Sequence, residues 1–298
     1  MTMDPTSTLR TVLENACAQV GFDATDATPL RVGENAIYRL QDGVIARIAR
    51  PGQQAAARRE VEVARWLEAS HVPAVRTIAG IDQPAIVDDR AVTFWHELPP
   101  HHHGSPSQVA HALRQLHNLP RPTSFDLGVV APFVRLDQRI ESALFLTDRD
   151  RVWMREHLDE LRSRWDKLPD GLPWCVIHGD AWVGNVVAAD DGTVLFLDLE
   201  RTSFGPPEWD LVHTAIKHSS FAWITAEDYR SFCEVYGHDV TAWAGFELLR
   251  DIREFRMTCM AAQSATTNDA DRDQALHRLA CVQGRHGPRP WSGWRSLG

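Results

Sequence analysis

The stretch VIHGDAWVGN, residues 176–185, ends an apolar run in Asp180 and places Asn185 a few residues later. Between Asn185 and Asp198, an Asp-Gly pair separates two β-like runs, which indicates a hairpin. The hairpin brings the ends of its two strands together, so Asn185 and Asp198 can share a cation while Asp180 lies beside them. Carboxylate and amide oxygens in this arrangement suit a proton acceptor and a hard metal ion. The spacing therefore predicts a catalytic aspartate next to a metal site.

The first third of the chain predicts a small, strand-rich unit that precedes this site. Residues 7–20 have the apolar spacing of a helix, and β-like runs follow from residue 30 to residue 48, with a turn at Gln41-Asp42-Gly43. A second helix is expected from residue 55 to residue 70, and two further short strands near residues 85–87 and 91–95. These elements predict a hairpin-based sheet with one main helix beside it.

The amino-acid composition changes at HELPPHHHGSPS, where prolines and a glycine interrupt any helix or strand. This stretch predicts a linker between two lobes. Beyond it the sequence is mostly helical, with one pair of strands around the stretch that ends in Asp180 and the run that ends in Asp198. Helices are expected over residues 107–119, 148–167, 208–221 and 241–262. The predicted division is 1–97 for the first lobe and 98–298 for the second.

Composition excludes several classes of protein. The net charge of -9 disfavours a nucleic-acid binder, which needs clustered basic residues, and the same acidity favours a cationic substrate. Apolar runs are too short to cross a bilayer, and the N-terminus has no basic segment followed by an apolar one. The five cysteines are scattered singly, which disfavours a disulfide framework or a zinc site and fits a reducing compartment. We expect a cytoplasmic protein, a monomer or a homodimer, that binds neither nucleic acid nor membrane.

The HGDxxxxN stretch with the later Asp198 resembles the catalytic loop and metal-binding aspartate of the aminoglycoside phosphotransferase family. This family contains small-molecule kinases with a two-lobed α+β fold like that of protein kinases: a small β-rich lobe with one main helix, and a larger, mostly helical lobe. The resemblance implies that Asp180 is the catalytic base, that His178 braces its loop, and that Asn185 and Asp198 hold Mg2+. In PPEWDLVH, Asp210 matches the residue that supports the catalytic loop. Glu200 is a further candidate contact to the metal or substrate.

The same resemblance places ATP or GTP in the first lobe. Gly33 and Asn35 of RVGENAIYRL match a nucleotide-binding loop. Arg47 of VIARI stands where most members carry a lysine that binds phosphate, and Glu60 matches its glutamate partner. Arginine contacts phosphate through a planar fork, so nucleotide binding is compatible with this departure. The segment TFWHELPP resembles the hinge that holds adenine by backbone groups, here His96, Glu97 and Leu98.

Three other features have a structural explanation beside the functional one. The three histidines at 101–103 are adjacent in a loop, so they are expected to be a solvated segment rather than ligands of one metal. On the helix that contains GFELLRDIREFRMTC, Asp251 and Glu254 are candidate contacts for an amine, but arginines nearby favour an exposed, salt-bridged face. Trp291 and its neighbour Trp294 are expected to close the substrate pocket.

The predicted activity is transfer of the γ-phosphate of ATP or GTP to a hydroxyl of a small molecule. The expected acceptor is an aminoglycoside or another amino-bearing sugar or alcohol, and phosphorylation of an antibiotic would cause resistance. Alternatives within the same chemistry are kinases of metabolites such as choline, homoserine or glucosamine. Two alternatives do not transfer phosphate to an acceptor. Arg47 in place of lysine suggests a nucleotide-binding pseudokinase, and the carboxylates of Asp180 and Asp198 suggest a metal-dependent hydrolase.

Overall fold

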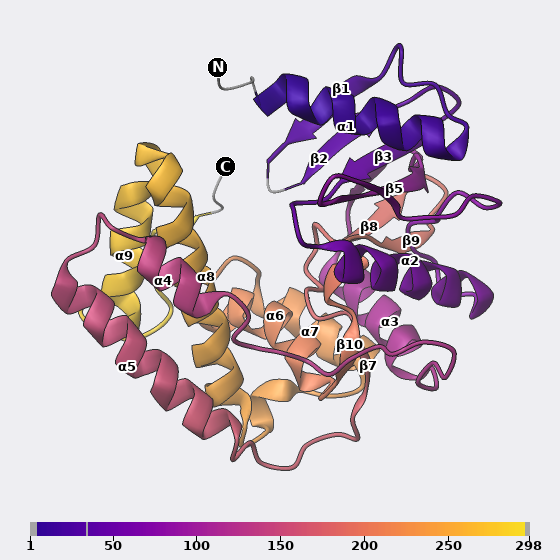
Figure 1. Ribbon diagram of the computed structural model, residues 1–298. Helices are drawn as coiled ribbons and strands as arrows, with labels where there is room; N and C mark the ends of the chain where they lie inside the picture. The colour runs from indigo at the N-terminus through magenta and orange to yellow at the C-terminus, as the bar shows by residue number, and fades with distance from the viewer. Residues whose placement is uncertain (1–4, 34, 296–298) are drawn as a thin grey trace.

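The computed structural model describes residues 5–33 and 35–295 and confirms the α+β, two-lobed kinase-like fold class. Figure 1 shows a five-stranded sheet with α1 (Pro5–Val20) lying across it, and a larger helical part below and beside the sheet. Glu34, in the expected nucleotide-binding loop, is outside the described residues. Within the described part of the chain, no helix is both long enough and apolar enough to span a membrane.

The sheet of the smaller part is antiparallel throughout, with the strand order β1-β2-β3-β5-β4. The predicted hairpin turn after residue 40 is present: Asp42 and Gly43 both have positive φ, 55° and 69°, as the twist of a tight hairpin requires. The apolar side chains of this sheet and those of α1 form one hydrophobic core cluster, which is separate from the core of the larger part. The strands are β1 (Thr28–Val32), β2 (Ala36–Arg39), β3 (Val44–Ile48), β4 (Ala85–Val87) and β5 (Arg90–His96).

Helix α2 (Gln54–Ala69) joins the two parts of the molecule. Its buried positions recur every three or four residues, which produces one apolar face. That face belongs to the same core cluster as the helices of the larger part, and α2 also contacts the segment that follows Asp198. Because α2 carries Glu60 on its buried face, its packing fixes the position of this carboxylate relative to the catalytic segments.

The expected break at residues 101–103 is wrong in one respect. His101–His103 form strand β6, which pairs with β8 (Val186–Ala189) directly after the catalytic stretch. The pairing uses backbone groups alone, so three exposed histidine side chains do not oppose it. This strand adds a third member to the small sheet β6-β8-β9, in which β9 (Val194–Phe196) forms the predicted hairpin with β8.

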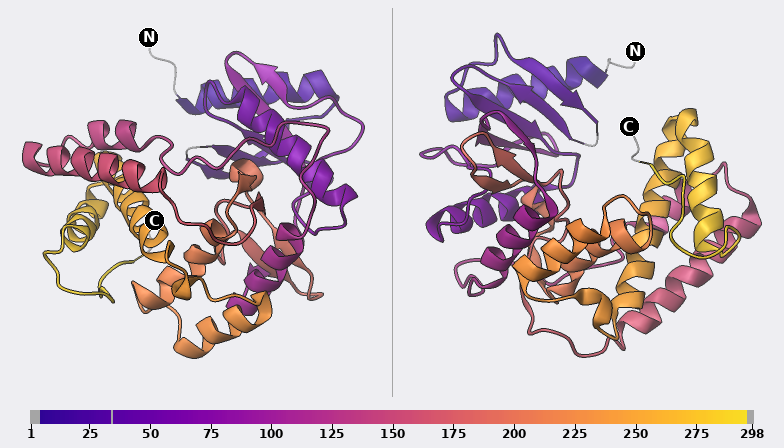
Figure 2. Two further views of the ribbon diagram at one scale, coloured as in Figure 1. Left: turned by 90° about the horizontal axis from the view of Figure 1, so that it is seen from below. Right: turned by 180° about the vertical axis from the view of Figure 1, so that it is seen from behind.

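The larger part consists mostly of helices around one core (Figure 2). The helices α3, α5 and α7 begin at capping residues Ser105, Thr147 and Thr225, whose side chains accept a hydrogen bond from the first turn. Helices α4, α5 and α9 pack against α8 or against one another to form an arm beside the core. The helices are α3 (Pro106–His117), α4 (Leu136–Ser142), α5 (Asp148–Trp165), α6 (Glu208–Ser219), α7 (Ala226–Tyr236), α8 (Phe246–Thr267) and α9 (Arg272–Val282).

The helix expected over residues 241–262 is two separate elements. A 3-10 turn, Val240–Ala242, ends where Trp243 adopts an extended conformation with φ -85° and ψ 141°, and α8 begins only at Phe246. The apolar spacing of this region is continuous, so spacing alone did not show the break. Helices α4, α7 and α9 were not expected; α4 has only seven residues, whereas α7 begins with a capping box that the sequence offered as a signal.

Candidate active site

The stretch that carries Asp180 connects strand β7 (Cys175–Ile177) to β8. Strand β7 itself pairs with β10 (Ser203–Gly205). Gly179 has a φ of +83°, and a Cβ there would lie 2.5 Å from the carbonyl oxygen of Arg201, so the close approach of the two backbones requires glycine. Asn185 donates from Nδ2 to the backbone oxygen of Asp180 at 3.0 Å and to its Oδ2 at 3.3 Å. The structure therefore brings Asp180 and Asn185 together as expected.

Asp198 follows β9 and faces the same region. Its backbone is left-handed, with φ 51° and ψ 67°, an uncommon conformation for a non-glycine residue and one that is concentrated at functional sites. The backbone N–H of Leu197 donates to the carbonyl oxygen of Asn185 at 2.8 Å, which places the residues before Asp198 beside Asn185. The Asp198 side chain is about half exposed, so its carboxylate is accessible to a ligand.

Asp210 of α6 holds the catalytic loop. Its carboxylate accepts hydrogen bonds from the backbone N–H groups of His178 and Gly179 at 2.7 and 2.8 Å, and its Oδ2 lies 3.1 Å from Nε2 of His117. Burial opposes ionisation of this carboxyl, but the hydrogen bonds and positive partners outweigh it and lower its pKa below the usual value. Asp210 is therefore an ionised anchor for the loop that carries Asp180.

His178 is buried and braces the loop from the other side. Its Nε2 lies 2.8 Å from the carbonyl oxygen of Leu197, and its Nδ1 accepts from the backbone N–H of Asp180 at 3.2 Å. These two contacts together require the proton on Nε2. The ring also stacks on Phe196. His178 thus links the Asp180 loop to the strand before Asp198.

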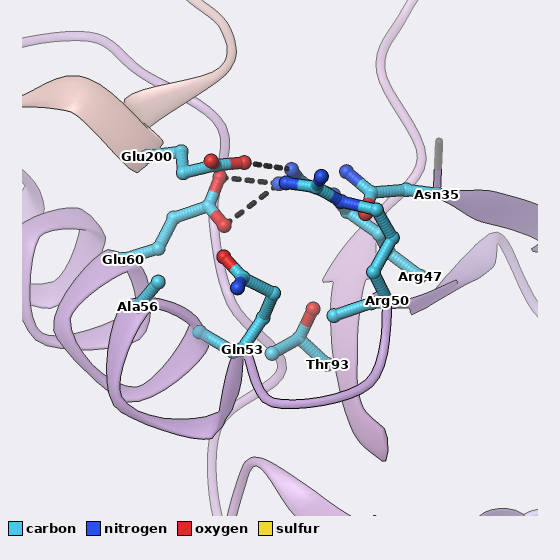
Figure 3. Close-up of a pocket in the computed structure, with 10 residues that line it drawn as sticks. Asn35, Arg47, Arg50, Gln53, Ala56, Glu60, Thr93 and Glu200 are labelled. Atoms are coloured by element: carbon cyan, nitrogen blue, oxygen red, sulfur yellow. Dashed lines mark hydrogen bonds and ion pairs between the residues drawn. The ribbon is translucent and has the colours of Figure 1, made fainter. Parts of the chain in front are cut away.

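Arg47 of β3 lies at the centre of a carboxylate cluster (Figure 3). Its Nη1 donates to both oxygens of Glu60, at 2.5 and 2.7 Å, and its Nη2 lies 3.0 Å from Glu200 and 3.9 Å from Asp198. Burial and the neighbouring carboxylates raise the pKa of Glu60 to about 7, while Arg47 opposes the rise. The predicted Arg47–Glu60 pair is present, and Glu200 also contacts the cation.

The expected nucleotide-loop and hinge residues lie at opposite ends of the sheet's strands: Gly33 and Asn35 between β1 and β2, and His96 at the other end, where β5 finishes. The Gly33 N–H donates to the Asn35 carbonyl oxygen at 3.2 Å, and the Asn35 amide oxygen, turned toward Arg47, accepts from its Nη2 at 2.8 Å. The N–H groups of His96 and Glu97 donate to the carbonyl oxygens of Arg76 and Gly43. The Glu97 side chain pairs with Arg39. Among the described residues no partner is found for the Leu98 N–H, so this group is the donor that the hinge can offer a base.

The sequence matches the Phosphotransferase enzyme family over residues 26–249, about three quarters of the chain. The chain belongs to this family. It is a small-molecule phosphotransferase. No curated protein matches the sequence at a significant level.

Several solved structures share the fold. An amicoumacin kinase in complex with AMP-PNP and Ca2+ has a TM-score of 0.70 and 14% identity, over 95% of this chain and 96% of its own. An aminoglycoside phosphotransferase from Streptomyces rimosus has a TM-score of 0.59 and 20% identity, over 83% and 99% of the two chains. A choline/ethanolamine kinase family protein from Mesorhizobium loti has a TM-score of 0.60 and 17% identity, over 94% of each chain.

Three positively charged or imidazole side chains near Asp180 of this phosphotransferase were not expected. Nε2 of His213 lies 3.5 Å from the Asp180 carboxylate, and Nη1 of Arg253 lies 4.0 Å from it. Burial lowers the pKa of Lys217 to about 8, against the opposing effect of Asp180. His213 and Lys217 lie three and seven residues after Asp210 on α6, so helical spacing from Asp210 is a sequence signal that could have found them.

The candidate amine contacts on α8 are already paired, and one of them, Glu254, is buried. Glu254 is fully buried and accepts from Nε of Arg289 at 2.8 Å, and Asp251 pairs with the same arginine at 3.1 Å. The expected face is salt-bridged in part, since Arg250 pairs with Glu247 at 3.5 Å and with Asp251 at 3.7 Å. It is not an exposed face, because Arg253, Glu254 and Arg256 are buried.

Trp291 and Trp294 are buried rather than at the mouth of a pocket. Their rings stack on each other, Trp294 stacks on Phe221, and the Trp291 N–H donates to the Ser220 carbonyl oxygen at 2.7 Å. Arg289 lies over the Trp291 ring. The C-terminal segment therefore covers the end of α6, and the expectation that these two rings close the substrate pocket is not supported by their packing.

The donor set fits a hard divalent ion held jointly with a nucleotide. Among the described residues, no three His, Cys, Asp or Glu side chains are grouped to hold a metal by themselves. Asn185 commits its Nδ2 to Asp180, which leaves its amide oxygen as a ligand, and Asp198 presents a half-exposed carboxylate. Mg2+ is commonly bound by one or two such oxygens, with phosphate oxygens and waters completing its shell.

Proposed function

We propose that this phosphotransferase moves the γ-phosphate of ATP or GTP to a hydroxyl group of a small molecule. The observation that carries the proposal is the reach of Arg47, whose guanidinium contacts Glu60 and Glu200 and comes within 3.9 Å of Asp198. This contact connects the cation of the nucleotide-binding sheet to the carboxylate proposed to hold the metal. We also propose the division of the chain into lobes at residue 97, with the nucleotide held mainly by the first lobe.

Each residue then has a definite task. Asp180 orients the acceptor hydroxyl and accepts its proton as the oxygen forms a bond to the γ-phosphorus, while the bond from that phosphorus to the β–γ bridging oxygen breaks. Asn185 and Asp198 would hold Mg2+, which would supply neutralisation of charge on the phosphates. Arg47 binds the phosphates through its forked donors, and Glu60 keeps it in place.

The rest of the nucleotide is assigned to the two ends of the sheet's strands. The backbone of Glu97 and Leu98 receives the base, and Gly33 and Asn35 cover the phosphates. Support comes from the amicoumacin kinase, whose structure contains AMP-PNP and Ca2+. The described cysteines are all free thiols, and the site requires a nucleoside triphosphate, so we propose that the reaction takes place in the cytoplasm.

The acceptor is less constrained than the reaction. An amino-bearing acceptor and a role in antibiotic resistance stay predictions from the sequence, and relatives of this fold include an aminoglycoside phosphotransferase, a spectinomycin phosphotransferase and a choline kinase. Asp251 and Glu254, the candidate contacts for an amine, are both paired with Arg289. The pseudokinase alternative is disfavoured because Arg47 has the same glutamate partner that a lysine would need.

The experiment is Mg2+-dependent release of ADP or GDP with a panel of hydroxyl-bearing acceptors, comparing the native protein with Asp180→Asn. We expect turnover to fall by roughly 100-fold or more in the variant, since general base catalysis contributes about that much, with nucleotide affinity nearly unchanged. Asp190→Asn, the same change at an exposed residue of the β8–β9 hairpin, is the matched control. Near-native turnover in Asp180→Asn would refute the assignment of the base.

A further inference from the structure

A second cavity, of about 190 Å3, lies beside the catalytic loop. It is bounded by the first half of α2, by residues 127–135, and by the segment from Glu200 to Ser203. Gly179, the residue before the catalytic aspartate, lines the cavity, and so does Trp209 at the start of α6. A molecule bound here is therefore next to the loop that carries Asp180, on the side of the helical arm rather than of the nucleotide hinge.

The lining of this cavity is strongly positive. Among the described residues that line the cavity, Glu200 is the only one with a carboxylate. That carboxylate already lies 3.0 Å from Nη2 of Arg47. Arg59, Arg201 and Arg256 have no ion-pair partner within 4.0 Å in the described part of the chain. The lining arginines are Arg50, Arg59, Arg135, Arg201 and Arg256.

Arg256 is the most informative of the arginines, because it is only 6% exposed. It donates to the Pro132 carbonyl oxygen, and its guanidinium lies 5.8 Å from the centre of the Trp209 ring. Burial lowers its pKa to about 10, with Arg201 acting in the same direction and Asp180 opposing it, so the side chain stays cationic at neutral pH. A buried cation without a paired carboxylate is costly, and an anionic ligand would offset that cost.

We propose that the acceptor carries an oxyanion, a carboxylate or a phosphate, in addition to the hydroxyl that is phosphorylated, and that Arg201 and Arg256 bind this oxyanion in the cavity. Arg59 of α2 faces the same cavity from the opposite lobe and adds a third donor. Planar guanidinium groups match the paired oxygens of carboxylate and phosphate. This inference rests on the proposed kinase activity and specifies its substrate class.

The chain as a whole is acidic, so the positive cavity is a local feature. Walls of one charge sign focus the field at a site and raise the local concentration of a ligand of opposite sign. The Asp180 carboxylate lies 4.0 Å from Nη1 of Arg253, one of the buried arginines of α8. An anionic group on the acceptor would bind the arginines while its hydroxyl approaches Asp180.

The test compares acceptors that share one hydroxyl-bearing frame and differ in charge. Glycerol, glycerate, glycerol 3-phosphate and 3-amino-1,2-propanediol form one set, and glucose, gluconate, glucose 6-phosphate and glucosamine form another. For each compound, kcat and KM are measured by ADP release, and binding is measured by titration calorimetry, which needs no turnover. The proteins are the native chain, Arg201→Met, Arg201→Lys and Arg59→Met. Arg58→Met is the matched control, because Arg58 is the exposed neighbour on α2 and does not line the cavity.

In at least one set we expect an anionic member to bind roughly tenfold or more tightly than the neutral and cationic members, since one charged hydrogen bond is worth about that factor. Arg201→Met abolishes this preference, Arg201→Lys keeps part of it, and Arg58→Met leaves it intact. A preference for carboxylate over phosphate, or the reverse, identifies which oxyanion the site takes.

Two outcomes overturn the proposal while the kinase stands: efficient turnover of the neutral or cationic members without any anionic preference, or a fall in kcat in Arg201→Met that is equal for all acceptors. The second result would mean that the arginines serve the transferred phosphoryl group. Absence of turnover with every compound would count against the proposed function. In that case calorimetry still decides the oxyanion site, because equal or undetectable binding of the anionic members overturns it.

Discussion

Replacement of Asp210 by asparagine tests whether one buried carboxylate positions the catalytic loop. The native carboxylate accepts from the N–H groups of His178 and Gly179 and lies within hydrogen-bonding distance of Nε2 of His117. Asparagine offers one oxygen and one NH2 group in the same space. If the oxygen keeps the contacts of Oδ2, the NH2 group faces the Gly179 N–H, and two buried donors then oppose each other.

The expected loss of stability follows from the number of buried donors left without an acceptor. Each buried donor left without an acceptor costs about 1–3 kcal/mol, and a charged acceptor is lost as well, so we expect Asp210→Asn to lower the free energy of unfolding by about 3 kcal/mol. Because the displaced groups belong to the loop before Asp180, turnover should fall even at temperatures where the variant is fully folded.

The assay is urea denaturation at pH 7 with kcat measured in parallel. Asp191→Asn is the control: Asp191 also accepts a backbone N–H, from Thr193 at 2.8 Å, but it is exposed, and the change should cost about 0.5 kcal/mol or less. A loss below about 1 kcal/mol in Asp210→Asn, with native turnover, would show that this carboxylate does not hold the loop.

The same variant predicts a change with pH. The pKa of Asp210 is lowered in the folded protein, so its contribution to stability is present above the pKa of an unfolded aspartate, about 3.9, and is lost as pH falls through the lower native value. Asparagine does not titrate. The difference in stability between the native protein and Asp210→Asn should therefore shrink in acid.

Two further predictions concern the metal and the acidity of the site. Asp198→Ala should weaken nucleotide binding in Mg2+ by roughly tenfold or more while leaving metal-free binding nearly unchanged, and equal affinities in a Mg2+ titration would contradict its role as a ligand. Lys217, with a pKa of about 8, is charged below that pH and neutral above it. If its charge assists the reaction beside Asp180, kcat/KM falls as pH rises through about 8, and Lys217→Arg shifts the fall to higher pH; an identical profile in the variant would exclude that role.

Short-range features of this protein were well predicted from the sequence. The hairpin turn at Asp42 and Gly43, the β8–β9 hairpin and the pairing of Arg47 with Glu60 are all present. Turns depend on the conformations open to two or three adjacent residues, whereas the Arg47–Glu60 pair was implied by the family resemblance. The roles given to Asp180, Asn185 and Asp198 stay predictions until the variants are measured.

Elements decided by partners elsewhere in the chain were predicted poorly. His101–His103 form a strand because β8 supplies backbone partners, and nothing within the histidine segment indicates that. Asp251 and Glu254 are paired because Arg289, far along the chain, reaches them. A local pattern cannot show which of several charged residues on a helix will meet a partner from another element.

The sequence by itself determined the family, the fold class and the order of the candidate catalytic residues, because these depend on motifs whose spacing is fixed along the chain. The net charge of -9 suggested a cationic substrate, yet only the tertiary structure placed Arg201 and Arg256 in one cavity beside the catalytic loop. Net charge averages over the whole surface, whereas a ligand responds to the few charges that packing brings within a few ångströms of it and shields from water.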